Sequence, residues 1–309
     1  MIGSSVMLSL KHDKSMKTIM LRRIVHQETL NFVLTNHIPR ALATRMMGRI
    51  SRIRSPLLTR ALIRIWRLFT DLDLSDSRQA RFQSLQECFT RDLKPGARIF
   101  DSAPAAVCSP CDAIVGACGQ VADGMVLQAK GMPYALKDLF GPGERWDEWR
   151  DGTYVTLRLT SAMYHRFHAP HNGQVEHVTY LSGDTWNVNP IALARIDRLF
   201  CRNERAAIRY RLNSGEPIAL VAVAAILVAS IRLPFIDKRF SIDYRGPTEI
   251  PCSTPFAKGD EMGWFEHGST IIVFAPAGMV LAPGLSEGVK LKAGEVLLML
   301  RSRISSRPS

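Results

Sequence analysis

The chain has 309 residues, of which 46% are hydrophobic, so it can bury a sizeable core and global disorder is excluded. Its net charge is +12, and from Lys14 to Arg67 twelve Lys or Arg residues stand against one acidic residue, Glu28. Such a balance predicts an anionic partner. Because this segment lacks a zinc finger, a basic zipper and an interleaved set of aromatic residues, we expect no nucleic-acid partner.

The region up to about residue 70 is predicted to be helical. A first helix begins near 36–39 and a second begins after Ser55–Pro56. The first has an apolar stripe made of Leu42, Met46, Ile50 and Ile53. The second has one apolar and one basic face, made respectively of Leu58, Leu62, Ile65 and Phe69, and of Arg60, Arg64 and Arg67. The pattern fits helices lying in the plane of an anionic membrane surface, or helices packed on the protein's own core or on a partner subunit.

Residues 75–93 are predicted to form a third helix, capped by Ser75 or Asp76. From about residue 105 the chain changes to short strands broken by Gly and Pro, among them 154–159, 174–178 and 270–274. The longest apolar stretch, Ile218 to Ile231, is too short to span a bilayer, which takes about 20 residues. We interpret it as a buried strand or two.

Two stretches near the end of the chain, 256–262 and 291–297, resemble each other, because each places Lys, Gly and an acid before apolar residues. They predict two related strand–turn units, as in small barrel-like sandwiches. The predicted fold class is α+β: basic amphipathic N-terminal helices followed by a mainly β, barrel-sandwich-like domain that carries the candidate catalytic residues. We expect a helical membrane-associating region at 1–100, the β-rich domain at 101–300 and a disordered tail at 301–309.

The six cysteines show no disulfide-framework spacing, which favours reduced thiols in a cytoplasmic compartment. Cys108 and Cys111 form a CxxC pair, but neither a second pair nor two histidines at ligand spacing accompany it. We therefore predict no metal site. No secretory signal is visible at the beginning of the chain.

Three short clusters contain residues suited to catalysis. Asp112 stands at the edge of an apolar run, where a carboxylate is commonly only a turn residue. Three of the eight histidines, His165, His168 and His171, fall within seven residues, and histidine is the natural general base near neutral pH. Gly268–Ser269 precedes the apolar strand at 270–274, and taken alone this Gly-Ser pair is an ordinary turn.

Together the three clusters resemble phosphatidylserine decarboxylases. The resemblance runs from about Leu30 to the C-terminal region and includes LTNHIPR, LKPGAR, SPCD, LQAKGMPY, YHRFHAPHNG, VNP, RNER and KGDEMGWFEHGST. The combination of YHRFH with KGDEMG and a later GST is highly selective. The chain departs from the family pattern in having Ala113 after the aspartate, Met163 before the Tyr-His pair and His267 before the glycine.

The resemblance implies a self-processing, pyruvoyl-dependent proenzyme. Asp112 would orient His168, His168 would deprotonate Ser269, and the Ser269 hydroxyl would attack the carbonyl of Gly268. Elimination and hydrolysis would turn residue 269 into a pyruvoyl group, the covalent cofactor, which binds the substrate amine as a Schiff base and accepts electrons as CO₂ leaves. His165 is the candidate donor of the proton that returns to the α-carbon.

The implied substrate is phosphatidylserine, converted to phosphatidylethanolamine and CO₂. The implied partners are an anionic membrane surface, the two cleavage fragments (1–268 and 269–309) as a heterodimer, and a homodimer of these. The expected location is peripheral, at the cytoplasmic face of the cell membrane of a bacterium. Two alternatives remain open: a pyruvoyl decarboxylase acting on another headgroup or a soluble amino acid, and a non-catalytic membrane-binding module.

Overall fold

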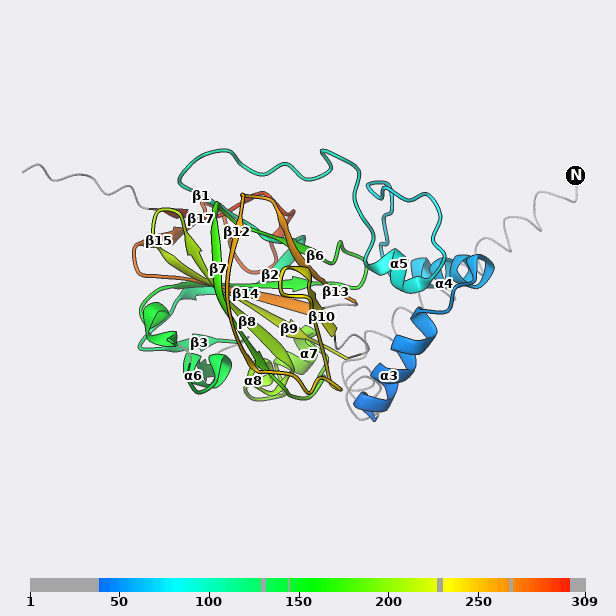
Figure 1. The fold of residues 1–309 in the computed structure, drawn as a ribbon, viewed down its shortest axis with the longest axis horizontal. Helices are drawn as coiled ribbons and strands as arrows, with labels where there is room; N and C mark the ends of the chain where they lie inside the picture. The colour runs from blue at the N-terminus through cyan, green and yellow to red at the C-terminus, as the bar shows by residue number, and fades with distance from the viewer. Residues whose placement is uncertain (1–38, 129–131, 144, 227–229, 267–268, 301–309) are drawn as a thin grey trace, which may run out of the picture.

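A computed structural model describes residues 39–128, 132–143, 145–226, 230–266 and 269–300 (Figure 1). The predicted tail at 301–309, the start of the first helix before Pro39, and Gly268 lie outside these residues. Within the described ranges, none of the helices has both the length and the apolar character needed to cross a membrane.

Helices are few and short, and three of them lie together at one end of the β structure, coloured blue to cyan in Figure 1. The described helices are α3 (Arg40–Ser51), α4 (Pro56–Phe69), α5 (Leu85–Phe89), α6 (Leu136–Phe140), α7 (Pro190–Leu193) and α8 (Leu199–Arg202), with 3-10 turns η1 (Trp146–Trp149) and η2 (Pro234–Ile236). The Ser55 hydroxyl accepts from the amide of Leu58 at 3.4 Å, which confirms the predicted start of the second helix.

The largest sheet has eight antiparallel strands in the order β12-β7-β8-β9-β14-β5-β2-β16. Smaller sheets have the orders β11-β10-β13-β6, β1-β17-β15 and β3-β4. The strands are β1 (Ala106–Cys108), β2 (Ala113–Gln120), β3 (Met125–Leu127), β4 (Pro133–Ala135), β5 (Thr153–Leu159), β6 (Arg166–His168), β7 (Gly173–Leu181), β8 (Arg205–Leu212), β9 (Pro217–Ala224), β10 (Ser230–Leu233), β11 (Lys238–Ser241), β12 (Glu249–Phe256), β13 (Glu261–Phe265), β14 (Ser269–Ala275), β15 (Met279–Leu281), β16 (Lys290–Leu291) and β17 (Val296–Leu300). The predicted α+β class with N-terminal helices and a mainly β remainder is confirmed.

Both faces of the large sheet are buried, and β14 shows how. Ile271 and Val273 point into a core shared with the two smaller sheets that contain β13 and β17. Ile272 and Phe274 point to the other face, where α6, α7, α8 and η1 cover the sheet. A strand buried on both faces reads as a continuous apolar run rather than an alternating one. The predicted strands at 154–159, 174–178 and 270–274, and the two strands within 218–231, are confirmed.

The third predicted helix, at 75–93, is wrong over most of its length. Only Leu85–Phe89 is helical, and its cap is Ser84, whose hydroxyl accepts from the amide of Glu87 at 3.1 Å. The preceding segment forms a bridge between Ser77 and Leu93 instead. Its backbone is held by local side chains, since the Asp73 carboxylate accepts from the Ser75 amide at 2.8 Å. Such local hydrogen bonds compete with helix formation.

The basic helix α3 docks on the β structure through ion pairs. Arg40 pairs with Asp184 at 2.5 Å, Arg45 with Asp243 at 2.7 Å, and Arg52, just past the helix, with Glu266 at 3.1 Å. Arginines of α3 therefore contact the protein's own surface, whereas the apolar stripe expected to pack on the core is exposed, with Leu42 at 55%. The arginines of α4 differ, because Arg60, Arg64 and Arg67 make no salt bridge or hydrogen bond to any described residue.

The prediction of two related strand–turn units near the end of the chain is confirmed. The first turn joins β12 to β13 and the second joins β16 to β17. Each contains a glycine in the left-handed region, Gly259 with φ +92° and Gly294 with φ +96°. Any other residue would be strained at these positions.

Candidate active site

Ser269 is the first residue of β14, and its backbone is fixed from both sides. It lies opposite Leu159 of β5 and Ala224 of β9 in the large sheet. Its side chain is fully buried, and among the described residues its hydroxyl has no hydrogen-bond partner. A buried hydroxyl without a partner loses hydration without compensation. Thr156 and Thr270 have such hydroxyls too, and Ser269 differs from them in lining a cavity.

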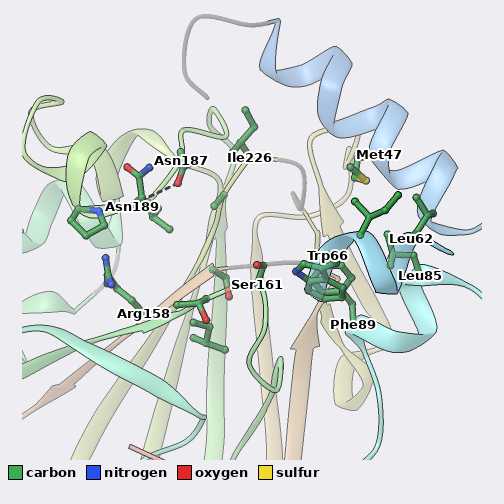
Figure 2. Close-up of a pocket in the computed structure, with 17 residues that line it drawn as sticks. Met47, Leu62, Trp66, Leu85, Phe89, Arg158, Ser161, Asn187, Asn189 and Ile226 are labelled. Carbon is green, nitrogen blue, oxygen red and sulfur yellow. Dashed lines mark hydrogen bonds between the residues drawn. The ribbon is translucent and has the colours of Figure 1, made fainter. Parts of the chain in front are cut away.

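Ser269 lies on the wall of a cavity of about 580 Å³ between α3, α4, α5 and the end of the large sheet (Figure 2). One wall is apolar, and its centre is the stacked pair Trp66 and Phe89, whose ring centroids are 4.3 Å apart. Across the cavity lie the polar residues Arg158, Asn187 and Asn189, with apolar residues such as Ile226 near them. The cavity can therefore hold a molecule with one apolar and one polar part.

The two residues that precede the 267–268 segment, Phe265 and Glu266, are held by a backbone hydrogen bond and by ion pairs. The amide of Phe265 donates to the carbonyl of His165 at 3.0 Å. Glu266 pairs with Arg239 at 2.6 Å and with Arg52 at 3.1 Å. Although burial raises the pKa of Glu266, the bonds and charge of Arg239 lower this pKa to about 2, so the carboxylate stays ionised. Only 267–268, which lie outside the described residues, separate these anchors from Ser269.

His165 lies directly behind one wall of the cavity. Its side chain is fully buried, and its ring meets the ring of Phe89 edge to face at a centroid distance of 5.4 Å. Phe89 in turn lines the cavity that contains Ser269. Of the two predicted catalytic histidines, His165 is thus the one that these contacts connect to the cavity.

His168 is held in a defined tautomer. Its Nδ1 is 2.9 Å from the carbonyl oxygen of Gly259, which can only accept, so Nδ1 carries the proton. Its Nε2 is 3.1 Å from the hydroxyl of Tyr164 and is therefore the basic nitrogen. Burial is the main cause that lowers the pKa of His168 below its usual value, so the imidazole is neutral at pH 7 and able to accept a proton.

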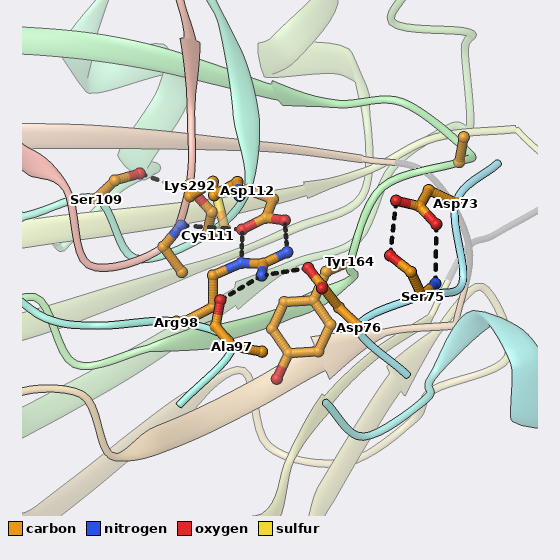
Figure 3. A network of polar contacts seen from close by, with 12 residues as sticks. Asp73, Ser75, Asp76, Ala97, Arg98, Ser109, Cys111, Asp112, Tyr164 and Lys292 are labelled. Atoms are coloured by element: carbon orange, nitrogen blue, oxygen red, sulfur yellow. Dashed lines mark hydrogen bonds and ion pairs between the residues drawn. The ribbon is translucent and has the colours of Figure 1, made fainter. Parts of the chain in front are cut away.

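Asp112 is buried and is bonded to groups other than this histidine (Figure 3). Both carboxylate oxygens accept from Arg98, at 2.7 Å for Oδ1, and Oδ1 also accepts from the amide of Ala293 at 2.9 Å. The guanidinium of Arg98 lies 5.9 Å from the ring centre of Tyr164. Among the described residues, the direct Asp112–His168 contact expected from the resemblance is absent: Nδ1 of His168 is bonded to the carbonyl of Gly259, and Asp112 is bonded to Arg98 and Ala293.

Arg98, Tyr164 and Gly259 are the functional neighbours that the sequence did not single out. All three lie inside the stretches that carry the resemblance, LKPGAR, YHRFH and KGDEMG. Among the described residues, no group of three or more His, Cys, Asp or Glu side chains is placed to hold a metal ion.

Two segments of the site, 108–113 and 168–173, are related to each other by an approximate internal two-fold symmetry. The amide of His168 donates to the carbonyl of Pro110 at 2.8 Å, and the amide of Cys108 donates to the carbonyl of Pro170 at 2.9 Å. His168 and Cys108 thus occupy matching positions, each two residues before a proline. The two segments, CSPCDA and HAPHNG, are followed by strands of the same sheet.

The match extends to the residue that binds each turn. Asn172 Oδ1 accepts from the amide of Lys258 at 2.7 Å, just as Asp112 Oδ1 accepts from the amide of Ala293. An asparagine therefore performs the structural task in one unit that an aspartate performs in the other. The charge of Asp112 is therefore not needed for the hydrogen bond to the turn; it pairs with Arg98 and raises the pKa of His168, against the larger lowering by burial.

An Asp112→Asn variant should fold, because Asn172 shows that an amide oxygen is sufficient for the turn. The negative charge of Asp112 raises the pKa of His168. Its removal should therefore move the inflection in the pH dependence of self-cleavage to lower pH, with a slower maximal rate, measured by gel densitometry of freshly refolded protein. Asn172→Asp is the matched control and should leave the inflection in place; a purely structural role of Asp112 predicts an unmoved inflection in both variants.

The RNER stretch supports the polar wall of the cavity. The side chain of Asn203 accepts from the amide of Trp186 at 2.8 Å and donates to the carbonyls of Trp186 and Ala224 at 2.9 and 2.8 Å. Trp186 directly precedes the cavity residues at 187–190, and Ala224 is paired with Ser269. One buried amide thus fixes the loop on one side of the cavity and the strand beside the serine.

The family model and the similar proteins that match this chain all belong to one family. Residues 85–299 match the family model described as phosphatidylserine decarboxylase. A phosphatidylserine decarboxylase proenzyme of Marinobacter nauticus is 34% identical over 81% of this chain and 90% of its own length. Proenzymes of the same name from Brevibacillus brevis and Chromobacterium violaceum are 32% and 35% identical over 85% and 80% of this chain, and over 95% and 90% of their own lengths.

Proposed function

The chain belongs to the phosphatidylserine decarboxylase family, and on this premise we propose that it converts phosphatidylserine to phosphatidylethanolamine and CO₂ after cutting itself between Gly268 and Ser269. The observation that carries this proposal is the environment of Ser269. Its hydroxyl is buried and has no hydrogen-bond partner in the described part of the chain. It stands at the first position of a fixed strand, on the wall of a cavity with one apolar and one polar side.

In the proposed self-cleavage, the Ser269 hydroxyl gives its proton to His168 and attacks the carbonyl carbon of Gly268. The peptide C–N bond breaks as an ester C–O bond forms. Loss of the Cα proton of residue 269 then breaks the Cβ–O bond and frees the carboxylate of Gly268. Hydrolysis of the resulting dehydroalanine, with release of ammonia, leaves a pyruvoyl group. Because no described contact joins His168 to Ser269, this step requires Nε2 of His168 to leave the Tyr164 hydroxyl and reach the serine.

The residues around position 269 fit this group. The small buried side chain at 269 lacks a competing hydrogen-bond partner among the described residues, and the flanking strands β5 and β9 hold its backbone at the cavity wall. A pyruvoyl group supplies a ketone that withdraws electrons from a bound amino acid as its carboxylate leaves. The apolar wall of Trp66 and Phe89 excludes water, and His165, behind Phe89, is our candidate to hold the proton that returns to the substrate.

The cleaved chain should stay assembled as a heterodimer. The small fragment, 269–309, begins with β14, which is paired along its whole length with β5 and β9 of the large fragment and is buried at every residue. The same fragment contributes β17, which pairs with β1. Removing a fully paired central strand would expose both cores, so cleavage does not release it.

Turnover measurements test the proposed function. The purified full chain, presented with phosphatidylserine in mixed detergent micelles, should release CO₂ and form phosphatidylethanolamine. Free serine and other soluble amino acids serve as competing substrates. Efficient turnover of a soluble amino acid alone would rule out the lipid assignment, and the absence of any decarboxylation by a fully cleaved protein would rule out the enzyme.

We further propose that the 1–100 region brings the site to an anionic membrane. Apolar side chains of α4 face solvent both on its apolar stripe and beside its arginines: Phe69 of the stripe is 47% exposed, and Leu57 and Leu68 outside it are 77% and 57% exposed. Three arginines of α4 have no described partner, and cations near an anionic surface contribute about 1 kcal/mol each. Ile65 is 52% exposed and also lines the cavity, so the apolar surface continues into the site.

A Leu57→Glu/Leu68→Glu variant should lose membrane binding and keep its chemistry, because neither side chain lines the cavity. Burial of a leucine contributes about 1.5–3 kcal/mol, so co-sedimentation with phosphatidylserine-containing vesicles should weaken at least tenfold. Turnover of detergent-dispersed substrate should be unchanged. Met125→Glu, also at an exposed apolar residue but on β3, is the control that should bind vesicles normally; equal binding by all three proteins would contradict the proposal.

A further inference from the structure

Arg158 contributes a positive charge to the wall of the Ser269 cavity. It lies on β5 opposite Thr270, next to Leu159, which is itself opposite Ser269. Figure 2 shows its guanidinium on the side of Asn187 and Asn189, across the cavity from Trp66 and Phe89. Gly116 makes room for its stem, since a Cβ there would approach Arg158 Cδ to 3.2 Å.

This charge has no described partner inside the protein. Arg158 is absent from every salt bridge and hydrogen bond among the described residues, and its Nε is buried. Burial lowers the pKa of Arg158, and Glu287 only partly opposes this. The guanidinium of the buried Arg205, in contrast, is hydrogen-bonded within the protein: it donates to the carbonyls of Leu139 and Cys201 at 2.6 and 2.7 Å. A partly desolvated guanidinium without an ion-pair partner among the described residues is available to bind an anionic group of a ligand.

We infer that Arg158 is the residue that anchors the anionic oxygens of the substrate headgroup beside residue 269. The inference rests on the proposed function. A guanidinium presents paired N–H donors that match carboxylate and phosphate oxygens. Phosphatidylserine carries both groups, and its acyl chains would lie toward Trp66 and Phe89 on the apolar wall. Arg158 is a positioning residue for the substrate and takes no part in self-cleavage.

The test is a comparison of Arg158→Gln and Arg158→Lys with the unaltered chain. Both variants should cleave to completion, as seen by intact mass. For detergent-dispersed phosphatidylserine, the KM of Arg158→Gln should rise about 10- to 100-fold, the range expected for loss of a charged hydrogen bond, with little change in kcat. Arg158→Lys keeps the positive charge but lacks the paired N–H donors of a guanidinium, so its KM should lie between that of the unaltered chain and that of Arg158→Gln. Arg150→Gln, which removes an exposed arginine outside the cavity, should behave like the unaltered chain.

Inhibition by analogues separates the two anionic groups. If Arg158 binds phosphate, Arg158→Gln should also weaken inhibition by phosphatidylethanolamine, which lacks the carboxylate. If Arg158 binds the carboxylate, that inhibition should be unchanged while inhibition by an N-acylserine weakens. An unchanged KM in fully cleaved Arg158→Gln would overturn the inference and leave the proposed function standing; an unaltered chain that neither cleaves nor turns over lipid would overturn the proposed function itself.

Discussion

A Ser269→Ala variant is expected to accumulate as one uncleaved chain without decarboxylase activity, whereas the unaltered chain yields fragments 1–268 and 269–309. Alanine has no oxygen to attack the carbonyl of Gly268, so neither the ester nor the ketone can form. The fold should be unaffected, because the Ser269 hydroxyl makes no hydrogen bond to the described residues and its removal leaves no partner unsatisfied. The expected loss is therefore chemical, and intact mass measurement checks it directly.

A matched control separates the loss of this hydroxyl from a general effect of altering a buried strand. Thr156 lies on the neighbouring strand β5, is fully buried, and also has a hydroxyl without a described partner. Thr156→Val should therefore be cleaved like the unaltered chain. Cleavage of Ser269→Ala between 268 and 269 would show that another group is the nucleophile, and an unfolded Ser269→Ala, detected by circular dichroism, would show that the hydroxyl has a structural role instead.

The strands were predictable where burial on both faces gave an unmistakable apolar run, as at 270–274 and 218–231. The helix predicted at 75–93 failed because its apolar spacing is real but its backbone is held by Asp73 and by a bridge from Ser77 to Leu93. Periodicity detects which side chains are buried, and a compact loop can bury Phe82 as well as a helix does. The ion pairs of α3 were equally invisible, since Asp184, Asp243 and Glu266 are more than a hundred residues away in sequence.

The site was only partly predictable. The sequence pointed to Ser269, His165, His168 and Asp112. The structure connects His165 to the cavity through Phe89, whereas His168 and Asp112 are bonded to other residues. The hydrogen-bond partner of His168 could not be predicted, because every residue has a backbone carbonyl and the sequence does not show which one accepts. The carbonyl of Gly259 bonds to Nδ1 of His168, where the carboxylate of Asp112 was expected. Arg158 was also missed, since an arginine in a strand is ordinarily a solvent-facing residue, and only the tertiary fold turns it toward the cavity.

A His168→Gln variant is expected to fold normally and to cleave itself about 10²- to 10⁴-fold more slowly, the usual contribution of a general base. Glutamine can still donate to the carbonyl of Gly259 and accept from Tyr164, the two contacts that hold the imidazole. Its amide cannot take a proton from Ser269 near neutral pH. The rate is measured as the disappearance of the full-length chain after refolding.

The neighbouring His171 provides the matched control, because it tests whether any buried histidine of this segment would have the same effect. Its ring is held by the carbonyls of Pro104 and Asn172 at 2.9 and 3.2 Å, and its contacts lead away from Ser269. His171→Gln should cleave at the unaltered rate. If His168→Gln cleaves normally, the base must be a different group. His165 would then be the next to test, because Phe89 brings it closest to the cavity, and the exchange of Tyr164 for Ser269 at Nε2 would have no part in the reaction.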